Sequence, residues 1–154
     1  MLVMAYHATF GLNTVITRCS NNYGPNQDAT KLIPKFITLF LQNKEVPLYG
    51  KGENIRDWVY VDDHVEALDI IFHKGKNGKT YNIGGNCELS NIEIVRKLLK
   101  LTSKGENLIK FVTDRKGHDF RYALDISETS KELGWKPKTK LEDGLAETFK
   151  FYSK

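Results

Sequence analysis

Residues 13–25 read NTVITRCSNNYGP, and this stretch decides the class of fold. Its first eight residues, which include Val15 and Ile16, are rich in the β-branched side chains that favour a short buried strand. The last five residues, 21–25, have the composition of a loop. A buried strand that runs directly into a polar loop is typical of an α/β domain. In open α/β sheets, ligands bind just past the carboxyl ends of such strands.

Helices and strands alternate along the rest of the chain. Apolar residues at helical spacing, with Pro34 tolerated in the first turn, predict a helix over 32–43. Since no linker-like or repeated segment interrupts the order, the chain is expected to form one mixed α/β unit over 1–154. The other predicted elements are strands at 45–49, 55–61, 79–83 and 108–112 and helices at 127–133 and 141–152.

Two further places have the pattern of a helix start. Ser90 and Glu93 have the spacing of a capping box, in which each side chain accepts a hydrogen bond from the other residue's backbone N–H. Asp62 and Asp63 are predicted to supply N-cap carboxylates for a helix that runs to about His73.

The composition narrows the class of protein. The 154 residues carry a net charge of +4, and the two cysteines form no C-x-x-C pair, so neither a disulfide scaffold nor a metal site is expected. No apolar run is long enough to cross a bilayer and no signal peptide is recognisable, which predicts a cytoplasmic protein. The basic residues are scattered without interleaved aromatic residues, which favours an anionic small molecule over nucleic acid.

Polar residues follow the first predicted strand and open the first long helix. Asn21 and Asn22 lie where ligands of α/β sheets bind, although an Asn pair before Tyr-Gly-Pro also serves as a turn cap. Lys31 precedes the predicted helix, so its ammonium and the free N–H groups of the first turn could face a phosphate. The alternative for Lys31 is a solvated surface charge.

Two charged segments are candidate anion contacts. Arg56 offers a bidentate fork for a diphosphate, with Asp57 beside it to fix its orientation; the alternative is an exposed Arg-Asp pair. Residues 114–119, DRKGHD, concentrate charges around a glycine and resemble a second cationic clamp or a solvated loop. With the aromatic ring of Tyr49, these cations would suit a nucleoside diphosphate.

Several common catalytic patterns are missing from the sequence. The twelve glycines include no G-x-G-x-x-G or G-x-x-G-x-x-G, the turn that lets a dinucleotide pyrophosphate approach a helix N-terminus. No tyrosine has a lysine four positions later, and no nucleophile elbow, Walker loop or His-Glu-x-x-His occurs. The chain by itself is therefore expected to be catalytically inactive.

Six blocks of the sequence form a recognisable set of motifs. In collinear order, the blocks are TRCSNNYGP at 17–25, KLIPKFI at 31–37, PLYGKGENIRDWVYVDDH at 47–64, YNIGG at 81–85, DRKGHDFRYALD at 114–125 and ELGWKP at 132–137. With these blocks, the chain resembles the C-terminal half of the dTDP-glucose 4,6-dehydratase family, which belongs to the extended short-chain dehydrogenases/reductases. The first and third blocks are common among nucleotide-sugar epimerases and dehydratases, whereas the fifth favours the dehydratases.

The resemblance implies an α/β fold that is the C-terminal part of an extended Rossmann-like protein. Residues 1–25 would be a remnant of the Rossmann domain, and 26–154 would be largely the small nucleotide-sugar-binding domain. The family uses NAD to convert dTDP-glucose into dTDP-4-dehydro-6-deoxy-glucose and water, a step toward rhamnose and related deoxysugars. The resemblance also implies a homodimer. That dimer would be compromised here, because residues 1–10 resemble only the latter end of the helix that carries the family's Tyr-x-x-x-Lys.

The resemblance also assigns roles to single residues. Asn21 would contact the substrate, and Asn22 would lie beside the nicotinamide end of NAD. The Gly-rich loop and the Tyr-x-x-x-Lys pair of the family would lie upstream of this segment, and Lys116 stands where the family usually has proline. The remaining substrate contacts would be Lys31, Leu32, Pro47, Leu48, Tyr49, Arg56, Asn91, Asp114, Arg115 and His118.

Two other interpretations stay open at this point. The chain could be a non-catalytic module that binds nucleotide sugars or pairs with a separate N-terminal half. It could also be part of a UDP-sugar epimerase or decarboxylase, which differs from a dehydratase in the DRKGH loop at 114–118 and in the base contacts near Tyr49.

Overall fold

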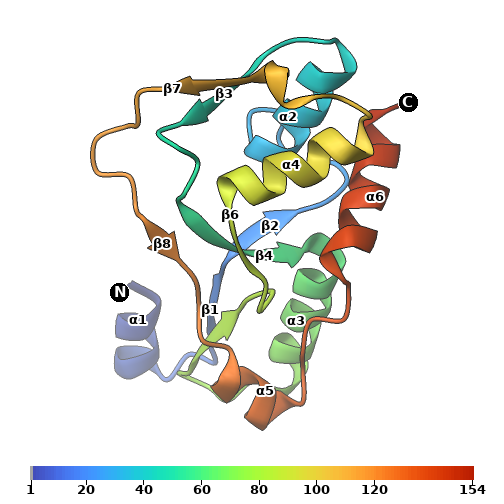
Figure 1. Ribbon diagram of the computed structural model, residues 1–154. Helices are drawn as coiled ribbons and strands as arrows, with labels where there is room; N and C mark the ends of the chain where they lie inside the picture. Colours follow the sequence, from blue (N-terminus) through green and yellow to red (C-terminus); the bar gives the residue numbers. More distant parts are fainter. Residues whose placement is uncertain (1) are drawn as a thin grey trace.

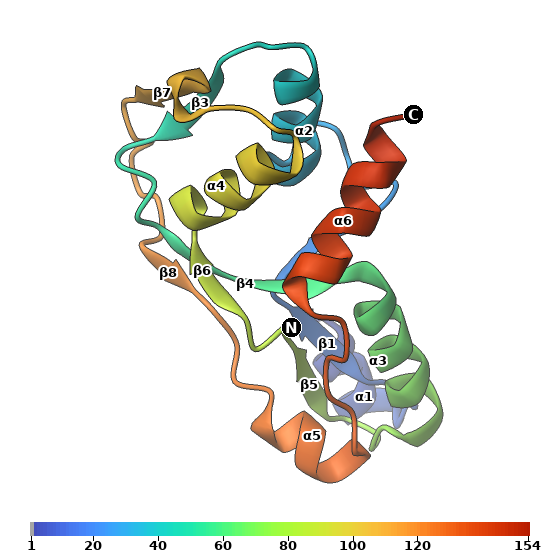
Figure 2. The same cartoon turned by 45° about the vertical axis from the view of Figure 1, so that its right-hand side comes forward.

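The computed structural model describes residues 2–154. Helices and strands are mixed along the chain, and the elements are drawn in Figures 1 and 2. Among residues 2–154, no helix combines the length and the apolar composition that crossing a bilayer requires. The elements are α1 (Leu2–Phe10), β1 (Ile16–Cys19), β2 (Asn21–Tyr23), α2 (Leu32–Leu41), β3 (Val46–Tyr49), β4 (Ile55–Tyr60), α3 (Val61–Lys74), β5 (Thr80–Ile83), β6 (Glu88–Ser90), α4 (Asn91–Leu101), a 3₁₀ turn at Glu106–Leu108, β7 (Ile109–Val112), β8 (Arg121–Tyr122), α5 (Ser127–Leu133) and α6 (Leu141–Tyr152).

Three small sheets organise these elements, and most of their pairings are parallel. β1 pairs with β5, and β2, which follows β1 after one residue, pairs with β4. β4 also holds β6 in antiparallel orientation and β8 in parallel orientation, while β3 pairs with β7 at the far end of the molecule. The expected mixed α/β class is confirmed, and β4 is the strand that holds β2, β6 and β8 together.

Two apolar cores lie at opposite ends of the central strands. The larger core packs α2, α4 and α6 against β3 and β4 and includes Phe40, Trp58 and Leu98. The smaller core lies between α3, β5 and α5 and includes Ile71 and Trp135. The proposed division of the chain at residue 25 remains a prediction.

The helix predicted over 32–43 ends two residues early. α2 spans Leu32–Leu41, and Asn43 adopts a left-handed backbone with φ of 54°. Asparagine tolerates that conformation better than most residues, so it stops the helix as a C-terminal cap residue. Pro34 lies in the first turn of α2, as predicted, where its missing N–H costs no helical hydrogen bond.

The loop predicted at 21–25 is wrong in its first three residues. Asn21, Asn22 and Tyr23 form β2, parallel to Trp58–Tyr60. The backbone of these polar residues finds partners in β4, and the Tyr23 ring is buried against Tyr60 with ring centroids 5.5 Å apart. Strand pairing across the fold therefore overrides the local turn preference.

One of the two predicted helix starts is confirmed and the other is wrong. The capping box of Ser90 and Glu93 opens α4 with both reciprocal hydrogen bonds. α3 instead begins at Val61, without a side-chain cap, so Asp63 lies inside the first turn. The buried Asp63 carboxylate accepts hydrogen bonds from the backbone N–H groups of Lys138 and Thr139, at 3.2 and 2.9 Å. This residue ties α3 to the segment that leads into α6.

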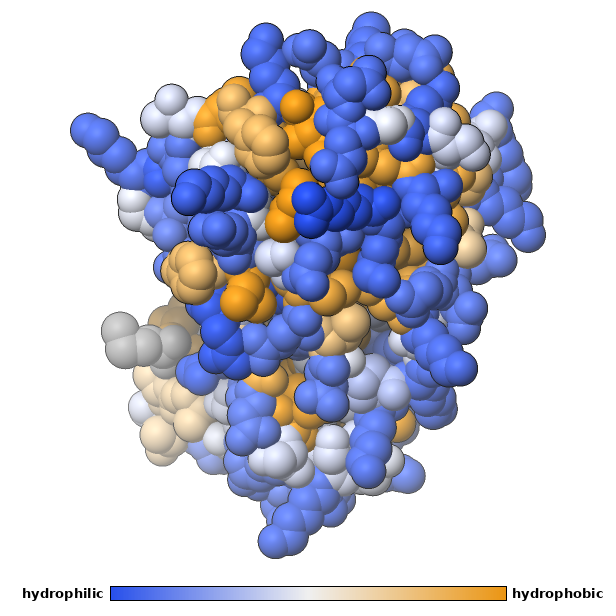
Figure 3. Space-filling view, in the orientation of Figure 1, coloured by the Kyte–Doolittle hydropathy of each residue, from blue (hydrophilic) through white to orange (hydrophobic). Residues whose placement is uncertain are grey.

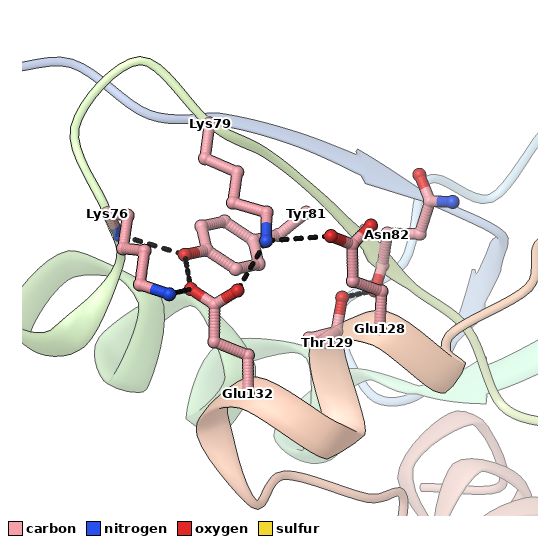
Figure 4. A network of polar contacts seen from close by, with 7 residues as sticks. All are labelled: Lys76, Lys79, Tyr81, Asn82, Glu128, Thr129 and Glu132. Atoms are coloured by element: carbon pink, nitrogen blue, oxygen red, sulfur yellow. Dashed lines mark hydrogen bonds and ion pairs between the residues drawn. The ribbon is translucent and has the colours of Figure 1, made fainter.

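A polar network fastens α5 to β5 (Figure 4). The ammonium of Lys79 pairs with the carboxylates of Glu128, at 2.7 Å, and Glu132. The Tyr81 hydroxyl donates to Glu132 at 2.6 Å and accepts from the backbone N–H of Lys76 at 2.8 Å. The hydrogen bonds from Lys79 and Tyr81 lower the pKa of Glu132 from its usual 4.5 to about 2.

Acid is expected to weaken this attachment. The pKa of Glu132 is lower in the folded chain than in the unfolded chain. Glu132 therefore stabilises the fold fully above its usual pKa of 4.5, and this stabilisation is lost as the pH falls toward about 2. The wild type should lose more unfolding free energy between about pH 5 and about pH 3 than Glu132→Gln does. Urea unfolding at the two pH values measures the difference. The exposed Glu53, substituted to glutamine, is the control that should behave like the wild type.

Candidate functional site

A cavity of about 390 Å³ opens between α2, β3, β4 and α4. The start of β2, the start of α2, the end of β3, the second residue of β4, the first residue of α4 and the loop after β7 surround it. Its volume is in the range of pockets that hold small molecules. The lining residues are Asn21, Thr30, Lys31, Leu32, Lys35, Phe36, Pro47, Leu48, Tyr49, Arg56, Asn91, Arg115 and His118.

Two aromatic rings form one wall. The rings of Tyr49 and His118 meet edge to face, with centroids 6.2 Å apart. Asp114 lies 2.7 Å from His118 Nδ1, and the side chain of His118 is only 5% exposed. The hydrogen bond from His118 lowers the pKa of Asp114 and keeps this carboxyl ionised near neutral pH. Asp114 thus holds His118 against Tyr49 rather than lining the cavity itself.

Arg56 forms the floor and is 8% exposed. Its guanidinium donates to the backbone oxygens of Ile55 at 2.6 Å and Asp119 at 2.8 Å. These carbonyls fix the planar group and tie it to the loop that carries His118. A guanidinium has five N–H donors, so donors remain for a ligand.

The prediction that Asp57 orients Arg56 is wrong. Neighbouring residues of a strand point to opposite faces, and Asp57, 1% exposed, faces away from the cavity. Its carboxylate accepts hydrogen bonds from the backbone N–H groups of Gly85 at 3.0 Å and Cys87 at 2.8 Å. The exposed Arg-Asp pair of the alternative interpretation is equally absent, because both side chains are buried and each has its own partners.

The cavity is electropositive. Lys31, Lys35, Arg56 and Arg115 line it, and no aspartate or glutamate does. Among residues 2–154, the ion pairs involve none of these four cations. Four cations without a carboxylate partner repel one another, and an anionic ligand with more than one charge would relieve that repulsion.

The N-terminus of α2 adds to this field. α2 begins at the cavity wall, and its N-cap residue Lys31 forms no side-chain cap, so first-turn N–H groups stay available. α4 also begins at the cavity, with Asn91, but its first N–H groups already donate within the chain and its capping box holds the Glu93 carboxylate there. Helix N-termini carry partial positive charge and bind phosphate groups.

The structure brings together nearly all of the predicted substrate residues. Every one of them lines the cavity except Asp114, which acts through His118. Sequence reasoning missed Thr30, Lys35 and Phe36, although Lys35 could have been found because it lies one helical turn after Lys31, on the same face. What these residues bind remains a prediction at this point.

Asn22, predicted to lie near a nicotinamide, does not line the cavity. Its Oδ1 lies 2.7 Å from His64 Nδ1, and its Nδ2 donates to the Ser20 carbonyl at 3.2 Å. Burial lowers the pKa of His64, which favours the neutral ring. Both ends of the Asn22 amide therefore have partners within the chain, and the contact of Asn22 with a nicotinamide remains a prediction.

The comparisons with known proteins agree with this arrangement. The sequence pattern of the family described as GDP-mannose 4,6-dehydratase matches residues 1–148. A dTDP-glucose 4,6-dehydratase from Actinoplanes is 48% identical over 152 residues, which cover 99% of this chain and 48% of the relative. The chain thus spans about half the length of the curated relatives it matches and aligns with their C-terminal half.

Solved structures show the same fold. A Bacillus anthracis dTDP-glucose 4,6-dehydratase in complex with NAD has a TM-score of 0.94 and 47% identity, covering 99% of this chain and 49% of its own. A Thermotoga maritima UDP-glucose 4-epimerase with UDP-glucose also has a TM-score of 0.94, with 31% identity over 99% of this chain and 50% of its own. The expected C-terminal part of a Rossmann-like short-chain dehydrogenase/reductase fold is confirmed, and the chain belongs to the GDP-mannose 4,6-dehydratase family.

Proposed function

We propose that this chain is the nucleotide-sugar-binding half of a dTDP-glucose 4,6-dehydratase. The observation that carries the proposal is the cavity lined by four cations and no carboxylate. A nucleoside diphosphate has the matching charge, together with a flat base that suits an aromatic wall. The identity of 48% with a dTDP-glucose 4,6-dehydratase supports this choice of substrate class.

Each part of the ligand has a place in this proposal. Pro47, Leu48 and Tyr49 hold the thymine base beside His118, while Arg56 and Arg115 bind the diphosphate. The sugar lies toward Asn21, at the start of β2. The start of α2, with Lys31 and Leu32, and the side chain of Asn91 complete the contacts.

The full reaction needs NAD, which the solved Bacillus anthracis relative binds. We propose that Asn22 contacts the nicotinamide end once the rest of a dinucleotide site is supplied by other residues. This chain contributes substrate binding and orientation, and it alone is expected to produce no dTDP-4-dehydro-6-deoxy-glucose from dTDP-glucose and NAD. In its cell, it would serve cytoplasmic synthesis of deoxysugars such as rhamnose.

Isothermal titration of the chain with dTDP-glucose tests the proposal. One binding site is expected, with affinity that falls as salt rises because the diphosphate contacts are electrostatic. The folded state is verified by circular dichroism. If the folded chain gives no heat of binding at millimolar ligand, both this proposal and the interpretation as a non-catalytic binding module are excluded.

A UDP-sugar epimerase is the second candidate from the same fold. The epimerase from Thermotoga maritima has equal structural similarity but lower identity, 31% against 47% for the Bacillus anthracis dehydratase. We therefore expect dTDP to bind more tightly than UDP. Tighter binding of UDP in the same titration would favour the epimerase.

Lys35 is expected to contribute to diphosphate binding. Its side chain is exposed at the cavity rim, so Lys35→Met should weaken dTDP binding by about two- to fivefold, the range of solvent-screened charge contacts. Lys44→Met, beyond the end of α2, makes the same change of charge outside the lining and should leave the affinity unchanged. Equal effects of the two variants would show that only net charge matters.

A further inference from the structure

Residues 24–31 connect β2 to α2 and carry part of the cavity wall. Thr30 and Lys31, at the end of this segment, line the cavity, and Lys31 is the N-cap residue of α2. Residues 28–31 are exposed, so little side-chain packing holds them in place. The position of Lys31 in the cavity wall therefore depends on the hydrogen bonds that hold this segment.

The end of the segment is a compact turn. Asp28 Oδ1 accepts hydrogen bonds from the backbone N–H and the hydroxyl of Thr30, each at 2.8 Å. The Asp28 carbonyl accepts from the Lys31 N–H at 3.0 Å. The two bonds from Thr30 lower the pKa of Asp28, which keeps its carboxylate ionised near neutral pH. Because an aspartate that bonds the backbone two residues later defines a turn, residues 28–31 form one rigid piece.

Tyr152, in the last turn of α6, holds this segment from a distant part of the chain. Its hydroxyl donates to the Gln27 carbonyl at 2.6 Å, across 125 positions of the sequence. Gln27 Nε2 in turn donates to the Asn22 carbonyl of β2 at 2.7 Å. Burial raises the pKa of Tyr152, which keeps the hydroxyl protonated and able to donate. Among residues 2–154, this is the one hydrogen bond that joins residues 24–31 to an element other than β2 and α2.

α6 is a firm support for that bond. Leu141 and Leu145 of this helix are buried in the larger core, and the Tyr152 ring packs against the same core. In the first turn, Glu142 pairs with Lys97 of α4 at 2.7 Å. The outer face is hydrophilic, as the right-hand edge of Figure 3 shows where Figure 1 draws α6. The helix is therefore fixed on the core, and its last turn offers the hydroxyl from a fixed place.

We propose that Tyr152 is a positioning residue of the cavity. It does not line the cavity itself. Through the Gln27 carbonyl, it determines how Lys31 and the first-turn N–H groups of α2 face the anionic part of the ligand. The proposal rests on the proposed function, because the diphosphate is the ligand named there.

Tyr152→Phe tests the proposal, because this variant loses the hydroxyl and keeps the ring in the core. It should bind dTDP about three- to tenfold more weakly, the range that one hydrogen bond between neutral groups is worth. It should bind thymidine, which has no phosphate, as well as the wild type does. Unchanged affinity for dTDP, or equal losses for dTDP and thymidine, would overturn the proposal.

Tyr81→Phe is the matched control. It also removes a tyrosine hydroxyl that has hydrogen-bond partners, but in the smaller core and outside the lining of the cavity. This variant should keep the wild-type affinity for dTDP even if it lowers the free energy of unfolding. An effect on dTDP binding that is equal in the two variants would show a loss of stability rather than of position, and would also overturn the proposal.

Amide NMR of the free chain gives a second readout that needs no ligand. In Tyr152→Phe, the amides of residues 27–31 should gain mobility on the picosecond-to-nanosecond timescale, while those of α3 keep their wild-type values. Unchanged mobility at residues 27–31 would overturn the positioning role. If the wild type fails to bind dTDP, the proposed function fails, whereas the spectra of the free chain still decide whether Tyr152 positions this segment.

Discussion

Asp57→Ala is expected to lower the free energy of unfolding by about 3 kcal/mol, because it removes a buried charged acceptor from two backbone N–H groups. The carboxylate holds Gly85 and Cys87 against β4, where a side chain at Gly85 would overlap the carbonyl oxygen of Trp58. Without Asp57, these N–H groups stay largely buried and lose their acceptor. Urea unfolding followed by tryptophan fluorescence measures the loss.

Two variants separate this role from a general effect of charge. Asp57→Asn keeps one acceptor oxygen and should lose roughly half as much, about 1.5 kcal/mol. Asp69→Ala removes an exposed carboxylate from α3 and should change stability by less than about 0.5 kcal/mol. A loss below about 1 kcal/mol for Asp57→Ala would contradict the proposed strength of this attachment.

Arg56→Met is expected to weaken dTDP binding about 10- to 100-fold, the effect of losing charge-assisted hydrogen bonds of about 1.5–3 kcal/mol. Methionine keeps most of the buried apolar stem, so packing under the cavity should change little. Titration calorimetry with dTDP measures the affinity, and Arg96→Met, at an exposed arginine on α4, supplies the matched change of charge.

The affinity for thymidine distinguishes the loss of a phosphate contact from a displacement of the loop that carries His118. Arg56 also holds the Asp119 carbonyl, so its loss could shift the loop that carries His118. If Arg56 binds phosphate, the variant should bind thymidine, which has no phosphate, as well as the wild type does. An equal loss for thymidine and dTDP would assign Arg56 to loop position instead.

Local signals predicted those elements that depend on near neighbours. The capping box of Ser90 and Glu93 joins residues three positions apart, and the structure contains both of its hydrogen bonds. β2 was missed because its strand character comes from pairing with Trp58–Tyr60, far along the sequence. Composition alone favours a turn for Asn21 and Asn22, and only the presence of β4 reverses that preference.

In the candidate site, too, residue identities could be predicted but contacts between distant parts of the chain could not. Motif resemblance placed Arg56, Asn91 and Arg115 in one site, and all three line the cavity. The orientation of Arg56 was not predictable, because its partners are backbone carbonyls, one of them at Asp119 in a distant loop. Side-chain identity in a sequence identifies possible donors, whereas backbone acceptors have no residue-specific signal.

The most direct test of the nucleotide-binding cavity is an amide NMR spectrum of this chain during titration with dTDP. Shifts are expected at the amides of residues 21, 30–32, 35, 36, 48, 49, 56, 91, 115 and 118, which line the cavity, and not on α1 or α5. Unchanged spectra at millimolar dTDP, or shifts centred on α1 or α5, would contradict the account.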